Sequence, residues 1–238
     1  RIVGMEALVR WKSPRWNNPE TGFVMPDRFI RVAEETGLIT DIGNWVLMEA
    51  CRQTREWHDL DERFRNLQVA INVSPSQLTE AFPSWLDEIL KRYDLEPSSL
   101  EIEITERESV KDHNLPILEE IRNRGISVAI DDFGIDYSAL SRLPKLSIDT
   151  IKLDKSYIDE IARDPDYENL VYHTIRMVHD FDYNVVAEGV EDLEQVTKLF
   201  QDMGCDRIQG FYFYRPMPPE SFLHELLQNF NKGIPAET

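Results

Sequence analysis

Acidic and amide side chains recur near the ends of the apolar segments of this sequence. Glu6 lies within IVGMEALVRW, Asn72 within LQVAINVS and Glu103 within LEIEITE. The same placement is repeated further along by Asp131, Asp132, Lys152, Asp154, Glu188 and Gln209. Carboxylate and amide oxygens are the ligands that hard cations such as Mg²⁺ and Mn²⁺ prefer, whereas zinc and copper favour other donors. The residue types therefore predict a site for divalent metal ions.

Each of these residues also has an ordinary structural interpretation. A glutamate at a strand end is usually a solvated rim residue, and adjacent aspartates can cap a helix. Lys152 can extend from a strand to the surface, and Asn72 can be a turn residue before Ser74 and Pro75. A run of successive strand ends is harder to explain in this way, because each carboxylate buried without compensation costs several kcal/mol. The set as a whole favours a functional site.

The elements that would position these residues alternate between strand and helix. Strands are predicted at residues 2–11, 66–74, 100–106, 126–132, 147–154, 184–190 and 207–213. Helices are predicted at residues 26–35, 41–60, 83–93, 115–124, 139–143, 167–181, 193–203 and 220–230. This alternation predicts a parallel sheet buried by helices, and in a barrel the carboxyl ends of the strands face one pocket.

Two α/β architectures fit the alternation. An open doubly wound sheet is one, but no glycine-rich phosphate loop follows the first predicted strand. A closed barrel needs about eight strands, and one would then lie upstream of Arg1. We therefore expect residues 1–238 to form a single barrel domain, cut from a longer multidomain protein. The segment 13–22, rich in proline and asparagine, is expected to form a loop over one end of the barrel.

Side chains alternate between the two faces of a strand, which sorts some of these residues. Glu6, Leu8 and Arg10 are expected to share one face. Asp131 and Asp132 are expected to point to opposite sides, one toward the barrel axis and one toward the rim. The two aspartates should therefore have different roles.

The composition excludes several classes of protein. The chain has 44 acidic and 26 basic side chains and a formal net charge of -18, which argues against general nucleic-acid binding. No apolar run approaches the roughly 18 residues of a membrane helix, and no signal peptide is present. The two cysteines do not indicate a disulfide framework, which favours a reducing, cytoplasmic location, with any membrane tether lying upstream. The five histidines show no zinc-like spacing.

The ordered segments resemble the EAL domain family of cyclic di-GMP phosphodiesterases. The resemblance is carried from Glu6-Ala7-Leu8 to Pro218 by NVS at 72–74, EITE at 103–106, DDFG at 131–134, KLD at 152–154, EGVE at 188–191, QGFY at 209–212 and RPMP at 215–218. It implies a modified TIM (β/α)8 barrel with one antiparallel strand pair. It also implies metal-dependent hydrolysis of cyclic di-GMP to linear pGpG.

The resemblance also assigns roles to individual positions. Metal ligands would be Glu6, Asn72, Glu103, Asp131 and Asp132. Catalytic residues would be Lys152, Glu188 and Asp132, with Glu188 either holding the second metal or acting as a general base. Substrate contacts would come from Arg10, Leu8, Gln209 and Asp154, and Glu106 and Glu191 would support the loop after Asp132. The cofactors would be two Mg²⁺ or Mn²⁺ ions, with Ca²⁺ inhibitory, and the partners would be cyclic di-GMP and a second copy of the chain.

One loop departs from the family pattern. Ile135 and Asp136 follow Gly134 where the family usually has a small residue and then glycine. Asp136 adds negative charge, so second-metal affinity or regulation is expected to differ. This departure supports an alternative in which the domain binds cyclic di-GMP as a receptor without cutting it.

Overall fold

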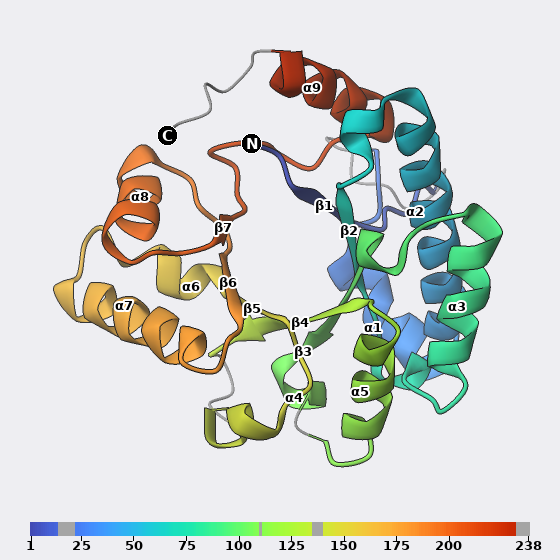
Figure 1. Ribbon diagram of the computed structural model, residues 1–238, viewed down its shortest axis with the longest axis horizontal. Helices are drawn as coiled ribbons and strands as arrows, with labels where there is room; N and C mark the ends of the chain where they lie inside the picture. Colours follow the sequence, from blue (N-terminus) through green and yellow to red (C-terminus); the bar gives the residue numbers. More distant parts are fainter. Residues whose placement is uncertain (14–21, 110, 135–139, 232–238) are drawn as a thin grey trace. The chain divides into compact units, whose positions relative to one another are not determined.

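The computed structural model describes residues 1–13, 22–109, 111–134 and 140–231 (Figure 1). The chain forms two units, the first made of Arg1–Glu101 with Pro218–Thr238 and the second of Ile102–Met217. Strand β3 (Leu100–Thr105) leads from the first unit into the second. Within the described residues, none of the helices combines the length and the apolar character that a membrane crossing requires.

In its described residues, the first unit contains two parallel strands and four helices. Its elements are β1 (Gly4–Ala7), α1 (Pro26–Thr36), α2 (Ile39–Leu60), β2 (Gln68–Asn72), α3 (Phe82–Tyr93) and α9 (Pro219–Asn231). Short 3₁₀ turns occur at Glu62–Phe64, Pro75–Gln77 and Pro97–Ser99. Strand β1 pairs with β2 in parallel, with Glu6 opposite Ala70. This register brings the end of β1 beside the end of β2.

Helix α9 completes an apolar cluster in the first unit. Its Leu226 is fully buried together with Trp57 from α2 and with Phe64 and Leu67 from the segment that follows α2. Figure 1 shows α9 beside the end of α2, although the two are far apart in sequence. Burial of four such side chains contributes on the order of 1.5–3 kcal/mol each. The C-terminal helix is therefore part of the core of this unit.

The second unit repeats the strand–helix pattern. Its elements are α4 (Glu106–Ser109), α5 (Leu115–Asn123), β4 (Ser127–Phe133), β5 (Thr150–Leu153), α6 (Lys155–Ile158), α7 (Pro165–His179), β6 (Asn184–Ala187), α8 (Leu193–Thr197) and β7 (Arg207–Ile208). A 3₁₀ segment spans Leu140–Lys145 and a π-helical turn spans Lys198–Asp202. Strands β4 to β7 pair in parallel with their neighbours, as predicted from the alternation.

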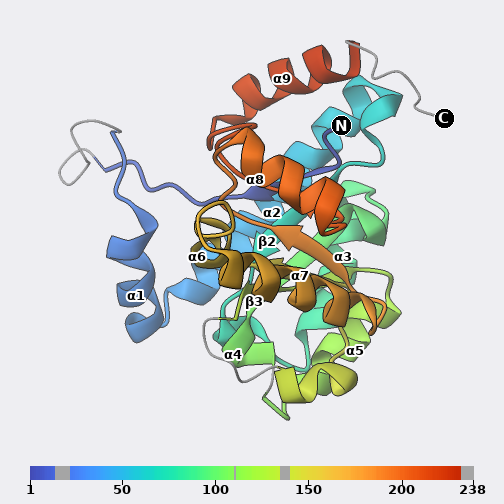
Figure 2. The same ribbon diagram turned by 90° about the vertical axis from the view of Figure 1, so that its left-hand side faces the viewer.

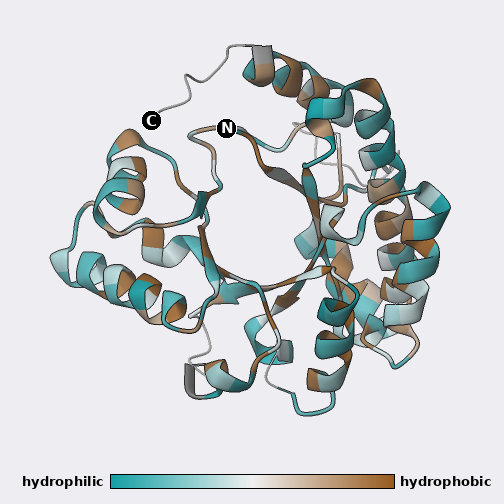
Figure 3. Ribbon diagram, in the orientation of Figure 1, coloured by the Kyte–Doolittle hydropathy of each residue, from teal (hydrophilic) through white to brown (hydrophobic). Residues whose placement is uncertain are grey.

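Helix α7 covers the sheet of the second unit through one apolar face. Val171, Ile175 and Val178 recur at helical spacing and are buried, and the helix lies beside β6 (Figure 2). The helix begins at Pro165 after Asp164, whose side chain accepts a hydrogen bond from the Asp166 N–H. Figure 3 shows apolar and polar residues alternating along this helix in the same way.

The structure corrects the length of several predicted elements. Strand β1 ends at Ala7 rather than Trp11, and β7 ends at Ile208 rather than Phe213. The short helix expected at 139–143 is a 3₁₀ segment from Leu140, and α4 and α6 were not predicted. The expected single domain, antiparallel strand pair and upstream strand stay predictions. Both cysteines are free and buried, as expected without a disulfide framework.

Candidate functional site

Lys152 in β5 is the centre of a charged cluster inside the second unit. Its Nζ lies 2.6 Å from Glu103 Oε1, 2.7 Å from Glu188 Oε1 and 3.3 Å from Asp131 Oδ1. The side chains of Lys152 and Glu103 are only 3% and 1% exposed. Burying an ion costs several kcal/mol, and close opposite charges offset that cost only when the geometry is good. The three carboxylates therefore stabilise Lys152 in its charged form at this position.

The cluster lies at the carboxyl ends of adjacent strands. Lys152 is near the end of β5, and Glu188 immediately follows β6. The Glu188 N–H donates to the Leu153 carbonyl at 3.1 Å, which extends the pairing of these two strands by one residue. Four residues from separate segments, predicted individually from strand ends, thus meet at one place. The sequence interpretation of Lys152 as a surface residue does not hold, because its amine is buried among acids.

Asp131 and Asp132 form a bulge in β4 opposite Lys152. Ile130 pairs with Ile151 and Phe133 with Leu153, so two residues of β4 face one residue of β5. Asp132 has a φ of +55°, and its N–H donates to Asp131 Oδ1 at 3.0 Å. A bulge redirects side chains locally. Here Asp131 turns toward Lys152 and Asp132 is exposed, in agreement with the expected division between them.

Glu106 makes a hydrogen bond with the segment after the two aspartates. Its carboxylate is buried, and Oε2 accepts a hydrogen bond of 2.9 Å from the N–H of Gly134. Because Glu106 begins α4 directly after β3, it ties the end of β3 to the end of β4.

Glu191 has a different partner, Lys155. The Lys155 Nζ lies 2.7 Å from Asp159 Oδ1 and 3.0 Å from Glu191 Oε1. The hydrogen bond that Lys155 donates to the Asp159 carboxylate is the main reason that the pKa of Lys155 is raised. Gly189 has a φ of +68°, and a Cβ there would lie 2.4 Å from Lys155 Cγ. Lys155, which sequence reasoning missed although it follows the KLD segment, therefore packs against the turn after Glu188.

The backbone of Gln209 and the side chain of Asp154 each make hydrogen bonds near the strand ends. The Gln209 N–H donates to the Ala187 carbonyl at 2.8 Å, and its carbonyl accepts from Val190 at 3.1 Å. The backbone of Gln209 therefore brackets the turn that contains Glu188. Asp154, expected to contact substrate, caps α6 by accepting a hydrogen bond of 3.0 Å from the Ser156 N–H.

The first unit contains an acid–amide pair. Asn72 Nδ2 donates to Glu6 Oε1 at 2.7 Å, across the neighbouring strands β2 and β1. Leu8 and Arg10 lie beyond the end of β1, so the expected shared strand face does not apply to them. Leu8 is exposed, and Arg10 Nη1 donates to the Val9 carbonyl at 2.8 Å.

The donors of the second unit fit a hard cation by type and by charge. Lys152 carries one positive charge against the three carboxylates around it, which leaves two formal negative charges within these four residues. That excess equals the charge of one divalent ion, and all the donors are oxygens. In the described part of the chain, no three His, Cys, Asp or Glu side chains are already arranged to hold a metal. The Lys152 ammonium lies among the acids instead.

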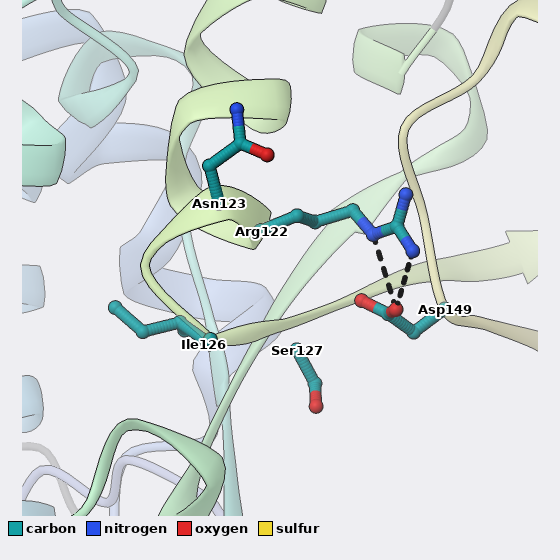
Figure 4. A pocket seen from close by; sticks show the side chains of 6 residues that line it. Arg122, Asn123, Ile126, Ser127 and Asp149 are labelled. Carbon is teal, nitrogen blue, oxygen red and sulfur yellow. Dashed lines mark hydrogen bonds and ion pairs between the residues drawn. The ribbon is translucent and has the colours of Figure 1, made fainter.

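A polar pocket lies at the amino ends of β4 and β5. It is lined by Arg122, Asn123, Gly125, Ile126, Ser127 and Asp149 (Figure 4). Arg122 donates twice to Asp149 Oδ1, at 3.0 and 2.8 Å, and Asp149 Oδ2 accepts from the Val128 N–H at 2.9 Å. Residues at the amino ends of barrel strands usually serve stability. We assign this ion pair to holding the start of β4.

Two sequence expectations fall outside the described residues. They are the loop expected at 13–22, of which residues 14–21 are not described, and the departure at Ile135 and Asp136.

Comparison with known proteins gives a consistent result. A family model described as "EAL domain" matches residues 1–216. The signaling protein YkoW of Bacillus subtilis (strain 168) is 41% identical over 225 residues, which are 93% of this chain and 27% of YkoW. The bifunctional diguanylate cyclase/cyclic di-GMP phosphodiesterase MucR of Pseudomonas aeruginosa is 39% identical over 227 residues, 93% of this chain and 32% of MucR. The chain spans about a quarter to a third of these curated relatives.

A solved structure shares the fold. The PaMucR phosphodiesterase, solved as a c-di-GMP complex, aligns with a TM-score of 0.84 at 38% sequence identity. The alignment covers 92% of this chain and 87% of that one. The predicted α/β fold of the TIM-barrel type is therefore confirmed.

Proposed function

This chain belongs to the EAL domain family, and we propose that it hydrolyses cyclic di-GMP to linear pGpG with the help of divalent cations. The observation that supports this most is the buried cluster of Lys152 with Glu103, Asp131 and Glu188. A phosphodiesterase needs positive charge for the phosphate and a group that accepts a proton from water. The cluster contains one cation, several proton acceptors and an excess of negative charge that a divalent ion would balance.

The cofactors in this proposal are Mg²⁺ or Mn²⁺, with two ions expected and Ca²⁺ expected to inhibit. Glu103, Asp131 and Asp132 would hold them in the second unit. Glu6 and Asn72 join the ligand set on the strength of the ordered sequence motifs alone. Divalent ions, when bound, supply Lewis-acid stabilisation of the charge that develops on a phosphate.

The chain's own residues have separate tasks in the hydrolysis. Lys152 donates hydrogen bonds that orient the attacking water. Glu188, whose Oε1 lies 2.7 Å from Lys152 Nζ, accepts the proton of that water. The water oxygen forms a bond to phosphorus, the bond from phosphorus to the 3′ oxygen breaks, and that oxygen takes up a proton. Arg10 suits a phosphate because its planar guanidinium can donate two parallel hydrogen bonds. Leu8, Gln209 and Asp154 complete the proposed contacts with substrate.

Turnover of cyclic di-GMP tests the proposal directly. The purified protein is incubated with cyclic di-GMP and Mg²⁺ or Mn²⁺, and pGpG is quantified by chromatography. Glu103→Gln should lower kcat by at least about 100-fold, because it removes a charge from the cluster. Glu119→Gln makes the same chemical change on the exposed face of α5 and should leave turnover unchanged.

The outcomes distinguish the two functions that the sequence allows, a phosphodiesterase and a receptor that binds cyclic di-GMP without cutting it. Formation of pGpG by the parent and its loss in Glu103→Gln support the enzyme. Binding of cyclic di-GMP by the parent without any pGpG would contradict it and support the receptor alternative. We also propose a homodimer on the basis of the family resemblance, and light scattering coupled to size exclusion would detect a monomer if this is wrong.

A further inference from the structure

Gly134, at the end of the acidic segment, is held through both of its backbone polar groups. Its N–H donates to Glu106 Oε2 at 2.9 Å, and its carbonyl accepts from the Tyr157 hydroxyl at 2.7 Å. Glu106 belongs to α4 and Tyr157 to α6. The residue after β4 is therefore tied to two other elements of the second unit. The contact from Tyr157 was not anticipated from the sequence.

The packing between Tyr157 and Gly134 is close as well as polar. Gly134 has a φ of +102°, and a Cβ there would lie 2.7 Å from atoms of the Tyr157 ring. Side chains do not approach so closely, so only glycine fits beneath this ring. The ring in turn meets Tyr167 of α7 edge-on, with 6.5 Å between centroids. Its orientation is thus fixed from both sides.

The segment before Gly134 is the part of β4 that needs to be held. Asp131 and Asp132 form the bulge opposite Lys152, and Asp132 has a φ of +55°. A left-handed conformation at a residue other than glycine is unfavourable and persists only when its surroundings enforce it. The two bonds at Gly134 anchor the bulge two residues after Asp132.

We propose that Tyr157 is a positioning residue for Asp131 and Asp132, acting through the hydrogen bond from its hydroxyl to the Gly134 carbonyl. Without that bond Gly134 keeps its hydrogen bond to Glu106 but loses its tie to α6, and the bulge opens more often. The orientation of Asp131 toward Lys152 then varies. The expected effect on cation binding and on turnover rests on the proposed function. The expected effect on amide hydrogen exchange of the backbone does not.

The substitution Tyr157→Phe isolates this bond, because it keeps the ring that packs on Gly134 and removes only the hydroxyl. Amide hydrogen exchange over residues 127–134 should become roughly five-fold faster, the factor that corresponds to one net hydrogen bond. Mn²⁺ binding, measured by calorimetry without nucleotide, should weaken by a similar factor. The kcat for cyclic di-GMP should fall while KM changes little.

Tyr183→Phe is the matched control in the same unit. The Tyr183 hydroxyl lies 2.9 Å from the carbonyls of both Leu143 and Leu146, away from the bulge. Its loss should lower stability by as much as Tyr157→Phe or more. It should leave exchange at 127–134, Mn²⁺ affinity and kcat at the parent values.

The exchange measurement decides the inference. Unchanged exchange over 127–134 in Tyr157→Phe, or equal acceleration in Tyr183→Phe, overturns it. If exchange accelerates only in Tyr157→Phe but the parent forms no pGpG, the positioning role stands and the proposed function fails. If the parent forms pGpG but exchange in Tyr157→Phe is unchanged, the proposed function stands and the positioning role of Tyr157 fails.

Discussion

Lys152→Met tests whether the ammonium is the internal counter-ion of the acidic cluster. Methionine matches the length of the lysine stem but carries no charge. The Glu103 carboxylate, which is 1% exposed, would then lose the ammonium that lies 2.6 Å from its Oε1. Removing one partner of a buried ion pair typically costs about 3–5 kcal/mol, because the other charge stays buried. At about 2–4 °C per kcal/mol for a chain of this size, Tm should fall by roughly 6–20 °C.

Thermal and urea unfolding followed by circular dichroism would measure this loss. Lys155→Met is the control, because the Lys155 side chain is 45% exposed and its ion pairs are screened by solvent. The control should cost less than about 1 kcal/mol. The double variant Lys152→Met/Glu103→Gln should recover part of the stability, since the uncompensated carboxylate has become a neutral amide.

Added Mg²⁺ gives a second test of the same idea. With the ammonium gone, a divalent cation should stabilise Lys152→Met more than it stabilises the parent, by an amount that grows with its concentration. A Lys152→Met protein that unfolds at the parent temperature would refute the reasoning. So would a double variant that is less stable than the parent by the full sum of the two single losses.

Two further predictions concern the backbone and pH. In urea unfolding, Gly189→Ala should destabilise the protein by more than Gly204→Ala. Both glycines have a positive φ, but only at Gly189 would the new Cβ lie 2.4 Å from a side-chain atom, Lys155 Cγ. Equal losses in the two variants would show that backbone conformation alone determines the cost. Desolvation lowers the pKa of His58 below 6.5, so its stabilising neutral form is lost as pH falls below that value. The free energy of unfolding should therefore decrease from pH 7 to 5 with a shallower slope in His58→Leu than in the parent, measured by urea titration at each pH. Identical slopes in the two proteins would contradict the assignment.

Most strands were predictable from the sequence because their apolar residues are buried where the pattern placed them. Residues 127–133 and 150–153 are examples, since both strands pair with neighbours along their length. Strand β7 was predicted too long because the apolar run continues from Ile208 to Phe213. The chain instead turns at Gly210, whose carbonyl accepts from the N–H groups of Phe213 and Tyr214. That turn depends on contacts with the segment at Val190, which no local pattern reveals.

The candidate site was predicted as a set of residues but not as an arrangement. Strand ends indicated Glu103, Asp131, Lys152 and Glu188 as neighbours, and the three carboxylates lie within 3.3 Å of the Lys152 amine. The central place of Lys152 was not predictable, because a lysine in a strand more often extends to solvent. The Asp132 conformation and the Tyr157 contact also depend on long-range packing. Sequence spacing carries no information about either.

The apolar cluster that α9 completes has a consequence for synthesis on the ribosome. Trp57, Phe64 and Leu67 emerge early, whereas Leu226 emerges more than 150 residues later. The second unit, Ile102–Met217, is continuous and emerges whole before α9. Chain synthesis proceeds at about 5–20 residues per second, so the apolar surface of the first unit stays exposed for on the order of ten seconds before α9 can cover it. A transcript truncated before Pro218 would make this exposure permanent, and chaperones and proteases would then decide the fate of the product.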